Sequence, residues 1–312
     1  MYFPYLRGKQ FELIALREFA NANPNNTNIC PIIEPVKTSF NSMNTAIDLM
    51  IENHLKFAII LNPKEGDYKR ENKDIINELP ILSTPNNIDS WIPAFIFNNN
   101  FEEINTIISD NALNNIMLIF KGGINIEDDR LMSFISQTNV KYIVYGDANS
   151  RNTKRNLDKF KKKIIRLDNN FIVQRKNSDY SDIQEEKFTE EHLFYVDDKF
   201  YGFADYTPLS KDFIEGGMLP YAVAIHLTYK KNNDEIWVGH FVSDTNDNTS
   251  NIQLKFSEAA NKAKVFFANK TKTTAILELE DYLNKQQYPG LGVIKKISIR
   301  NHIELINSIL TK

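Results

Sequence analysis

The sequence predicts an α/β protein folded as a distorted (β/α)8, TIM-like barrel. Eight apolar, β-prone runs recur at intervals suited to βα units, and several end in a polar residue, as parallel strands buried on both faces do. The segments between them carry apolar residues at helical spacing. Because strands alternate with helices, the sheet should be parallel, and eight strands in 312 residues favour closure into a barrel. The alternative is an open, doubly wound sheet.

The elements are expected in the following order along the chain. An N-terminal helix should cover 11–20, where apolar residues give one broad face. The expected barrel strands are Ile29–Glu34, Phe57–Asn62, Trp91–Phe97, Ile116–Lys121, Tyr142–Asp147, Ile164–Asp168, Tyr201–Tyr206 and Ala222–Tyr229. Glu235–Ser243 should be an extra strand, joined to the eighth as an antiparallel hairpin through the polar turn 232–234. Helices are expected to follow it.

We expect a single barrel domain over 1–312, because no linker rich in Gly, Pro or Ser divides the chain. Residues 235–312 are then a C-terminal extension of the barrel. The least regular segment is Phe171–Lys199, which is long and polar. A connection of this kind in a barrel is usually a functional lid or a mobile excursion, so we expect it over or beside the barrel mouth.

Bulk properties narrow the class of protein. The net charge of −3 gives no general attraction to nucleic acid. The basic run 154–166 keeps a nucleic-acid partner open, with a solvated helix face as the alternative. The single cysteine, Cys30, allows no internal disulfide. The sequence has neither a long apolar stretch nor a signal-like N-terminus. We therefore expect a cytoplasmic protein without a membrane partner. The sequence signatures of P-loop NTPases, serine α/β-hydrolases, zincins and zinc ribbons are absent.

Several segments resemble a known family. The opening 2–16, YFPYLRGKQFELIAL, and Ile33-Glu34-Pro35 are similar to the "beta protein" family, which is named after a phage protein. Four further segments are similar to a bacterial branch of that family: 174–180 (QRKNSDY), 202–206 (GFADY), 224–226 (AIH) and 240–244 (HFVSD). The resemblance implies a prokaryotic or phage setting and a part in phage–host conflict, and it brings no assigned reaction. Arg175 and Tyr206 lie within these motifs and are candidates for substrate binding.

Polar side chains at the strand ends are the first candidates for a site. The carboxyl ends of barrel strands form one mouth, where the active sites of such barrels lie. The residues expected there are Glu34, Asn62, Lys121, Asp147, Asp168, Asp205 and His226. Paired carboxylates can hold Mg²⁺ or Mn²⁺ or divide acid and base roles, so Glu34 and Asp205 are the candidate metal ligands and catalytic carboxylates. The alternative is that these polar residues simply end their strands.

Basic residues expected near the same mouth are candidates for binding an anion. Lys121, followed by two glycines, can form a Schiff base or bind a phosphate, and a solvated lysine in a plain loop is the alternative. Arg7 and Lys9 lie in the opening motif. They can bind an anionic ligand or pair with a strand-end carboxylate, and a salt-bridge network at a helix start is the alternative.

His226 and His240 form the most specific predicted pair. If the hairpin turn is centred on Asn233, the two histidines face each other on one side of the ribbon. His226 shares its strand face with small residues, so we expect it to point into the barrel as a general base or metal ligand. The carboxylates Glu34 and Asp205, in the same cleft, would then raise the pKa of His226. Two structural histidines are the alternative.

The leading hypothesis is a barrel enzyme, of the metal-assisted hydrolase type, that acts on a phosphate-bearing or otherwise anionic substrate. Glu34, Asp205, His226 and His240 would supply acid, base or ligand groups, and the basic residues would contact the anion. The rival hypothesis is a non-catalytic recognition protein that binds a phage or host protein through Phe171–Lys199 and the barrel mouth. The fold alone does not choose between them, because barrels carry many functions.

Overall fold

The computed structural model describes residues 1–71, 73–146, 151–216 and 220–311. Contacts within the chain group these residues into two compact units. The first unit comprises Met1–Lys9, Ala20–Asn169 and Glu191–Asp205, and the second comprises Gln10–Phe19, Asn170–Glu190 and Tyr206–Lys312. The expectation of one domain over 1–312 stays a prediction.

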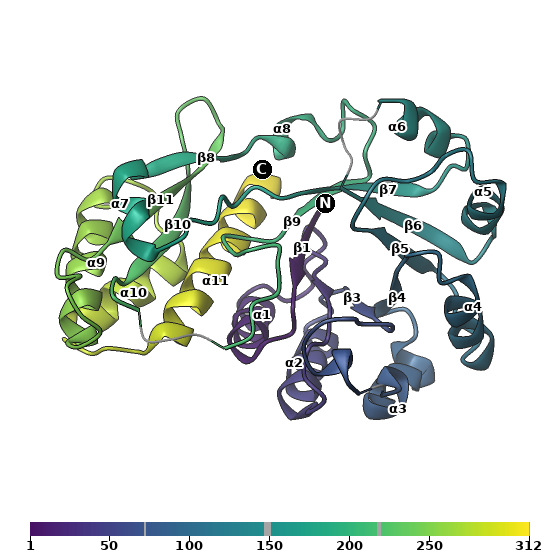
Figure 1. The fold of residues 1–312 in the computed structure, drawn as a ribbon, viewed down its shortest axis with the longest axis horizontal. Helices are drawn as coiled ribbons and strands as arrows, with labels where there is room; N and C mark the ends of the chain where they lie inside the picture. The colour runs from purple at the N-terminus through teal and green to yellow at the C-terminus, as the bar shows by residue number, and fades with distance from the viewer. Residues whose placement is uncertain (72, 147–150, 217–219, 312) are drawn as a thin grey trace. The chain divides into compact units, whose positions relative to one another are not determined.

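The first unit is a closed barrel of eight parallel strands, which confirms the predicted fold class (Figure 1). Around the barrel the strands are β1 (Tyr2–Leu6), β2 (Ile32–Ile33), β3 (Phe57–Ile60), β4 (Trp91–Ile96), β5 (Ile116–Phe120), β6 (Val140–Tyr145), β7 (Lys163–Asp168) and β9 (Gly202–Asp205). Strands β3 and β5 are apolar and buried at every position, because the barrel interior covers one face and helices cover the other. The pairing of β1 with β9 closes the barrel.

Helices and short 3₁₀ turns connect the barrel strands. They are α2 (Asn41–Glu52), η1 (Gly66–Lys69), α3 (Ile75–Glu78), η2 (Pro80–Ser83), η3 (Pro85–Asn87), α4 (Phe101–Asp110), α5 (Asp129–Ser136), α6 (Arg151–Asp158) and α8 (Glu191–Phe194). Figure 1 shows α2, α4, α5 and α6 on the outer side of the strands. The side chain of Asp128 accepts a hydrogen bond from Leu131 N at the start of α5, which satisfies one of the free N–H groups of the first turn.

The identity of two barrel strands differs from the prediction. Ala222–Tyr229 was expected to be the eighth strand, but it lies in a separate sheet, and Tyr2–Leu6 takes a place in the barrel instead. Pro4 argues against a central strand, because a proline cannot donate to the ladder. The pairing on the β2 side is interrupted at this proline, with a bridge from Tyr2 to Ile29 before it and regular pairing from Tyr5 onward.

The second unit is built on a three-stranded antiparallel sheet of order β10-β11-β8, together with helices. The elements are η4 (Asn177–Asp179), α7 (Tyr180–Ile183), β8 (Glu185–Thr189), β10 (Ala224–Lys230), β11 (Ile236–Val242), α9 (Ile252–Phe266), α10 (Thr274–Asn284) and α11 (Leu291–Leu310). Helix α1 (Gln10–Ala22) forms as expected, and its Gln10–Phe19 part groups with this unit. The predicted hairpin and C-terminal helices are confirmed.

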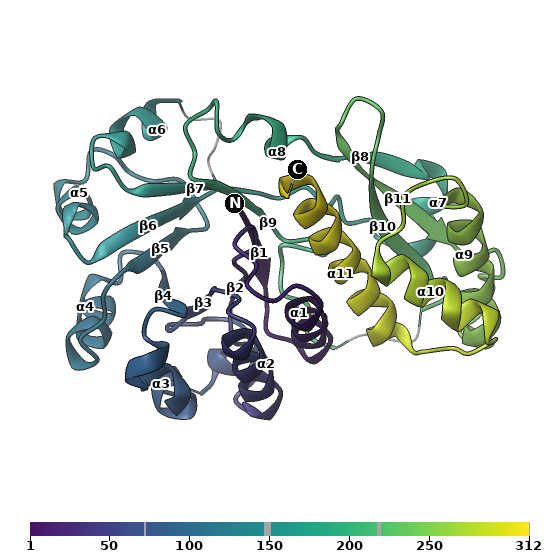
Figure 2. The ribbon, with the colours of Figure 1, turned by 180° about the vertical axis from the view of Figure 1, so that it is seen from behind.

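One face of the small sheet forms the core of the second unit. Ile225 and Leu227 of β10 pack with Phe256 of α9 and Ile276 of α10, so the bulky face of the strand meets helices. Figure 2 shows α11 running along β10. Asn301 of α11 donates to the carbonyl of Thr228 at 2.9 Å, which protects this edge strand from further pairing.

The segment Phe171–Lys199 is more regular than expected. It contains η4, α7, β8 and α8, and β8 pairs with β11 as the third strand of the small sheet. The polar residues that suggested an excursion lie partly on this strand, whose first three residues are not buried. None of the helices in the described part of the chain combines the length and apolar composition of a membrane span.

Candidate functional site

The carboxylate of Glu34 is the centre of a buried cluster at the barrel mouth. Glu34 directly follows β2 and is 0% exposed. Its Oε2 accepts hydrogen bonds from Tyr5 Oη at 2.7 Å, from Arg7 Nη1, and from Lys121 Nζ at 3.0 Å. Tyr5 lies on β1, Arg7 follows β1 and Lys121 follows β5, so strand ends distant in the sequence meet at one carboxylate.

The electrostatics of this cluster favour an ionised Glu34. Burial alone would raise the pKa of Glu34, but Lys121 and Arg7, with the hydrogen bonds from Tyr5 and Lys121, hold that pKa below its ordinary value. The pKa of Lys121 is lowered by burial, and Arg7 lowers it further while Glu34 opposes the shift. The Arg7 guanidinium and the Lys121 ammonium each lie 5.3 Å from the centre of the Tyr5 ring.

Two features of the cluster point to a ligand. Two cations surround one carboxylate, so the formal charge of Arg7, Lys121 and Glu34 together is positive, although Glu65 is a further negative charge that acts on Lys121. The second carboxylate oxygen, Glu34 Oε1, is buried and has no hydrogen-bond partner among the described residues. A buried, unpaired carboxylate oxygen is costly, and a bound O–H or N–H group would satisfy it.

The loop that carries Glu34 is held by the loop after β3. Asp67 accepts a hydrogen bond from Thr38 N at 3.1 Å and another from Lys37 Nζ at 3.0 Å. Gly66, with φ of 64°, approaches so closely that a Cβ atom there would lie 2.1 Å from the carbonyl oxygen of Val36. Only glycine fits this backbone conformation and this contact.

Replacing Gly66 by alanine should therefore destabilise the protein by about 2 kcal/mol, because the new methyl group meets backbone and the left-handed conformation is strained. Gly123→Ala is the matched control, since a Cβ there meets nothing within 4 Å. Urea unfolding at neutral pH measures both. Equal stability of the two variants would contradict the role given to Gly66.

A second group of charges lies at the ends of β7 and β9. Asp168 and Asp205 are register partners on these neighbouring strands. Tyr2 donates to Asp205 at 2.7 Å, and Arg166 Nε donates to Asp168 at 2.8 Å. Burial raises the pKa of Asp168, and the charge of Asp205 raises it further, against the opposing effect of Arg166. Glu34 thus follows β2 and Asp205 ends β9, the two strands that flank β1, and each carboxylate accepts a hydrogen bond from a different tyrosine of β1.

A metal ion does not fit these groups well. Across the residues that the structure describes, no set of three His, Cys, Asp or Glu side chains is arranged to hold one. The Oε2 atom of Glu34 is already bonded to two cations, which would repel Mg²⁺ or Mn²⁺. The surroundings of Glu34 therefore suit an anion better than a metal cation.

The two histidines form a pair, but not in the barrel. His226 on β10 is the register partner of His240 on β11, as predicted, and their Nδ1 atoms are 2.8 Å apart. Because β10 is not a barrel strand, the argument that strand order would bring His226 beside Glu34 and Asp205 does not hold. The expected rise in the pKa of His226 is also wrong: burial, with a smaller effect of His240, lowers it to about 3. Burial lowers the pKa of His240 to about 4.

The remaining predicted residues have varied surroundings. The Asn62 amide both donates to and accepts from the backbone of Ile96 at 2.9 Å, so its role is structural. Lys9 is half-buried at the start of α1, and Arg175 is exposed. Tyr206 is buried. Asp147 lies outside the described residues.

Sequence reasoning missed the tyrosines of the barrel cluster. Tyr2 and Tyr5 lie in the opening motif, but that run was not assigned to a strand, so their side chains were not placed at the mouth. Glu186, whose Oε1 lies 3.3 Å from His240 Nε2, was missed because its strand was expected to be irregular. Its strand, Glu185–Thr189, has a single apolar residue and no alternation, so the sequence carried no local signal for it.

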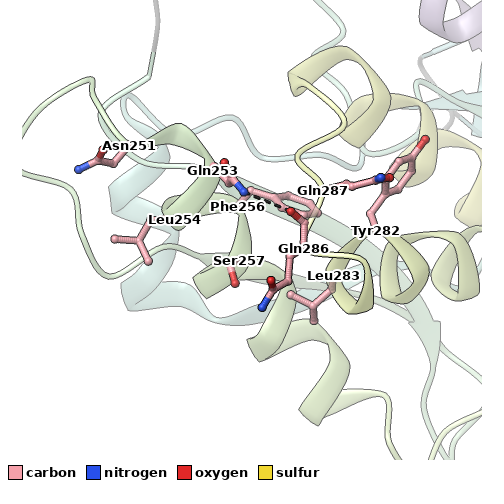
Figure 3. Close-up of a pocket in the computed structure, with 9 residues that line it drawn as sticks. All are labelled: Asn251, Gln253, Leu254, Phe256, Ser257, Tyr282, Leu283, Gln286 and Gln287. Carbon is pink, nitrogen blue, oxygen red and sulfur yellow. Dashed lines mark hydrogen bonds between the residues drawn. The ribbon is translucent and has the colours of Figure 1, made fainter.

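A cavity of about 400 Å³ lies between α9 and the end of α10 (Figure 3). Gln253 donates a hydrogen bond to the carbonyl of Gln286 across it at 3.1 Å. Its lining residues carry no carboxylate, histidine, lysine or arginine. The cavity therefore offers no acid–base chemistry near neutral pH.

Comparisons with protein-family models, with curated proteins and with solved structures gave no match to this chain. The resemblance to the beta protein family stays a prediction. Function is accordingly inferred from the side chains and their surroundings.

Proposed function

We propose that the barrel is an enzyme that acts on a phosphate-bearing or otherwise anionic small molecule, bound at its mouth by Arg7 and Lys121. The observation that carries the proposal is the contact of Lys121, from the end of β5, with Glu34, from the end of β2. It places a second cation beside a carboxylate that Arg7 already neutralises. This second cation can pair with a bound anion.

Each member of the cluster has a separate task in this proposal. Lys121 is the most exposed of the three charged side chains, at 31%, so it is the cation that meets the substrate first. Arg7 lies deeper, where its guanidinium pairs with Glu34 and adds a fixed positive charge beside the substrate. Glu34 stays ionised, and its Oε1 accepts a hydrogen bond from a substrate hydroxyl or amine. The substrate is thus an anion that also carries a hydrogen-bond donor.

Lys121→Met tests the anion site. Isothermal titration calorimetry with inorganic phosphate should show binding to the unmodified protein and at least about tenfold weaker binding to the variant, because one charge-assisted hydrogen bond is lost. Lys141→Met is the control: it removes an equal charge from an exposed position of β6. No phosphate binding, or equal binding to both variants, would contradict the proposal and leave the recognition protein as the remaining hypothesis.

The hydrogen-bond acceptor is tested with two ligands that differ in one group. At a pH where both esters are dianions, 2-hydroxyethyl phosphate should bind more tightly than ethyl phosphate, because only its alcohol hydroxyl can then donate to Glu34 Oε1. A panel of phosphate monoesters, assayed for released phosphate, then tests for turnover. Loss of any turnover in Lys121→Met, with turnover kept in Lys141→Met, is the expected pattern.

A further inference from the structure

The histidine pair of the second unit is linked to a carboxylate in a chain of hydrogen bonds. Glu186 Oε1 lies 3.3 Å from His240 Nε2, and His240 Nδ1 lies 2.8 Å from His226 Nδ1. The rings of Phe171 and Tyr180 enclose the pair: their centroids lie 5.0 and 4.6 Å from that of His226. Tyr180 is held in turn by Gln174 N, which donates to its hydroxyl at 3.1 Å.

The chemistry of this chain fixes the proton positions. Both histidines have lowered pKa values and are neutral near pH 7, so each carries one proton. Burial raises the pKa of Glu186, but when Glu186 is ionised it only accepts hydrogen bonds, and His240 Nε2 then carries the proton that faces it. His240 Nδ1 is then an acceptor, and His226 Nδ1 must donate to it. The remaining nitrogen, His226 Nε2, is left with a lone pair.

This lone pair has no partner in the part of the chain that the structure describes, since the only hydrogen bond of His226 there is the one to His240. His226 is half-buried and lines a cavity of about 420 Å³. Phe171, Tyr180, Leu291 and Ile294 supply apolar walls to the same cavity. Gln174, Asn177, Ser210, Lys295 and Ser298 also line it, so the cavity combines apolar walls with a few polar groups, as small-molecule sites do.

We propose that this cavity binds a small aromatic molecule carrying an O–H or N–H donor, which His226 Nε2 accepts. The aromatic preference follows from the Phe171 and Tyr180 rings, against which a ligand ring can pack edge to face. Glu186 and His240 are positioning residues: they do not touch the ligand but fix the tautomer of His226. This proposal and the anion site proposed for the barrel are independent, and neither rests on the other.

Phenol and anisole are the probes, because anisole has a methyl group in place of the hydroxyl hydrogen of phenol and cannot donate. Ligand-observed NMR titration of the full chain should show phenol binding at least about tenfold more tightly than anisole. His226→Leu should bind the two equally, whereas Ser298→Ala, at another residue of the cavity wall, should keep the preference. Absence of phenol binding, or equal affinities in the unmodified protein, would overturn the proposal.

A second measurement does not depend on how well the His226 variant folds. Long-range ¹H–¹⁵N correlation spectra of the unmodified protein report which nitrogen of each histidine is protonated. We expect a proton on Nδ1 of His226 and on Nε2 of His240. A proton on Nε2 of His226 would overturn the proposal, because that nitrogen would then be a donor.

Discussion

Replacing Arg7 by methionine is expected to lower the stability of the protein by about 3 kcal/mol at pH 7, the loss typical of breaking a buried ion pair. Glu34 is fully buried, and Arg7 is one of the two cations bonded to it. Methionine keeps the length and apolar character of the side chain but removes the charge. The variant leaves the carboxylate with Lys121, whose side chain is partly exposed, as its one remaining cationic partner in the described chain.

The effect of Arg7→Met should depend on pH. The pKa of Glu34 in the folded protein lies below its ordinary value of 4.5, so its ionised form stabilises the fold above that pH, and this contribution is lost as the pH falls through the folded pKa. Without Arg7 the pKa of Glu34 in the folded protein rises, because burial opposes ionisation and one of the two cations that favour it is gone. As the pH falls, Glu34 is therefore protonated at a higher pH in the variant than in the unmodified protein, and protonation removes the cost of its buried charge. The difference in stability should therefore shrink between pH 7 and pH 4.

Urea unfolding at several pH values measures this difference. Lys64→Met is the control, because Lys64 pairs with Glu103 at the surface, and its loss should change stability by less than about 1 kcal/mol at any of these pH values. A stability difference for Arg7→Met that stays constant with pH would show that the lost contact is packing and not charge.

Arg300→Met should destabilise the second unit by a similar amount, about 3 kcal/mol. Arg300 on α11 bonds to Glu18 of α1, lies 3.1 Å from Glu278 of α10, and pairs with Glu304 at 2.9 Å. Its side chain is only 10% exposed. Lys296 would be left to balance Glu18 and Glu278 alone, and Glu304 would lose its salt-bridge partner.

The matched control is Lys285→Met on the same unit. Lys285 pairs with Asp281 four residues earlier, and both side chains are more than half exposed, so its loss should change stability by less than about 0.5 kcal/mol. Chemical denaturation of both variants gives the comparison. If Arg300→Met is as stable as Lys285→Met, the ion pairs of Arg300 do not hold α1, α10 and α11 together.

Local patterns were sufficient for the fold class and for the histidine pair. The apolar runs of β3 to β7 and the helical spacing between them are set by short-range periodicity, so the alternation of strands and helices could be predicted directly. His226 and His240 are joined by a single hairpin, and the turn alone fixes which residues face each other. The register was therefore predictable even though the position of the hairpin in the fold was not.

The closure of the barrel and the barrel-mouth cluster depended on contacts that no local pattern reports. Pro4 kept β1 from being recognised as a strand. Its pairing with β9 joins Tyr2 to Phe203, which are far apart in the sequence. Lys121 and Glu34 are 87 residues apart, and neither residue predicts the other. By itself the sequence determined most of the strands and helices, though not β1 or β8, and that carboxylates and cations follow the strands. The tertiary structure decided which strand ends meet, because burial at the mouth makes a carboxylate stable only where the fold places cations beside it.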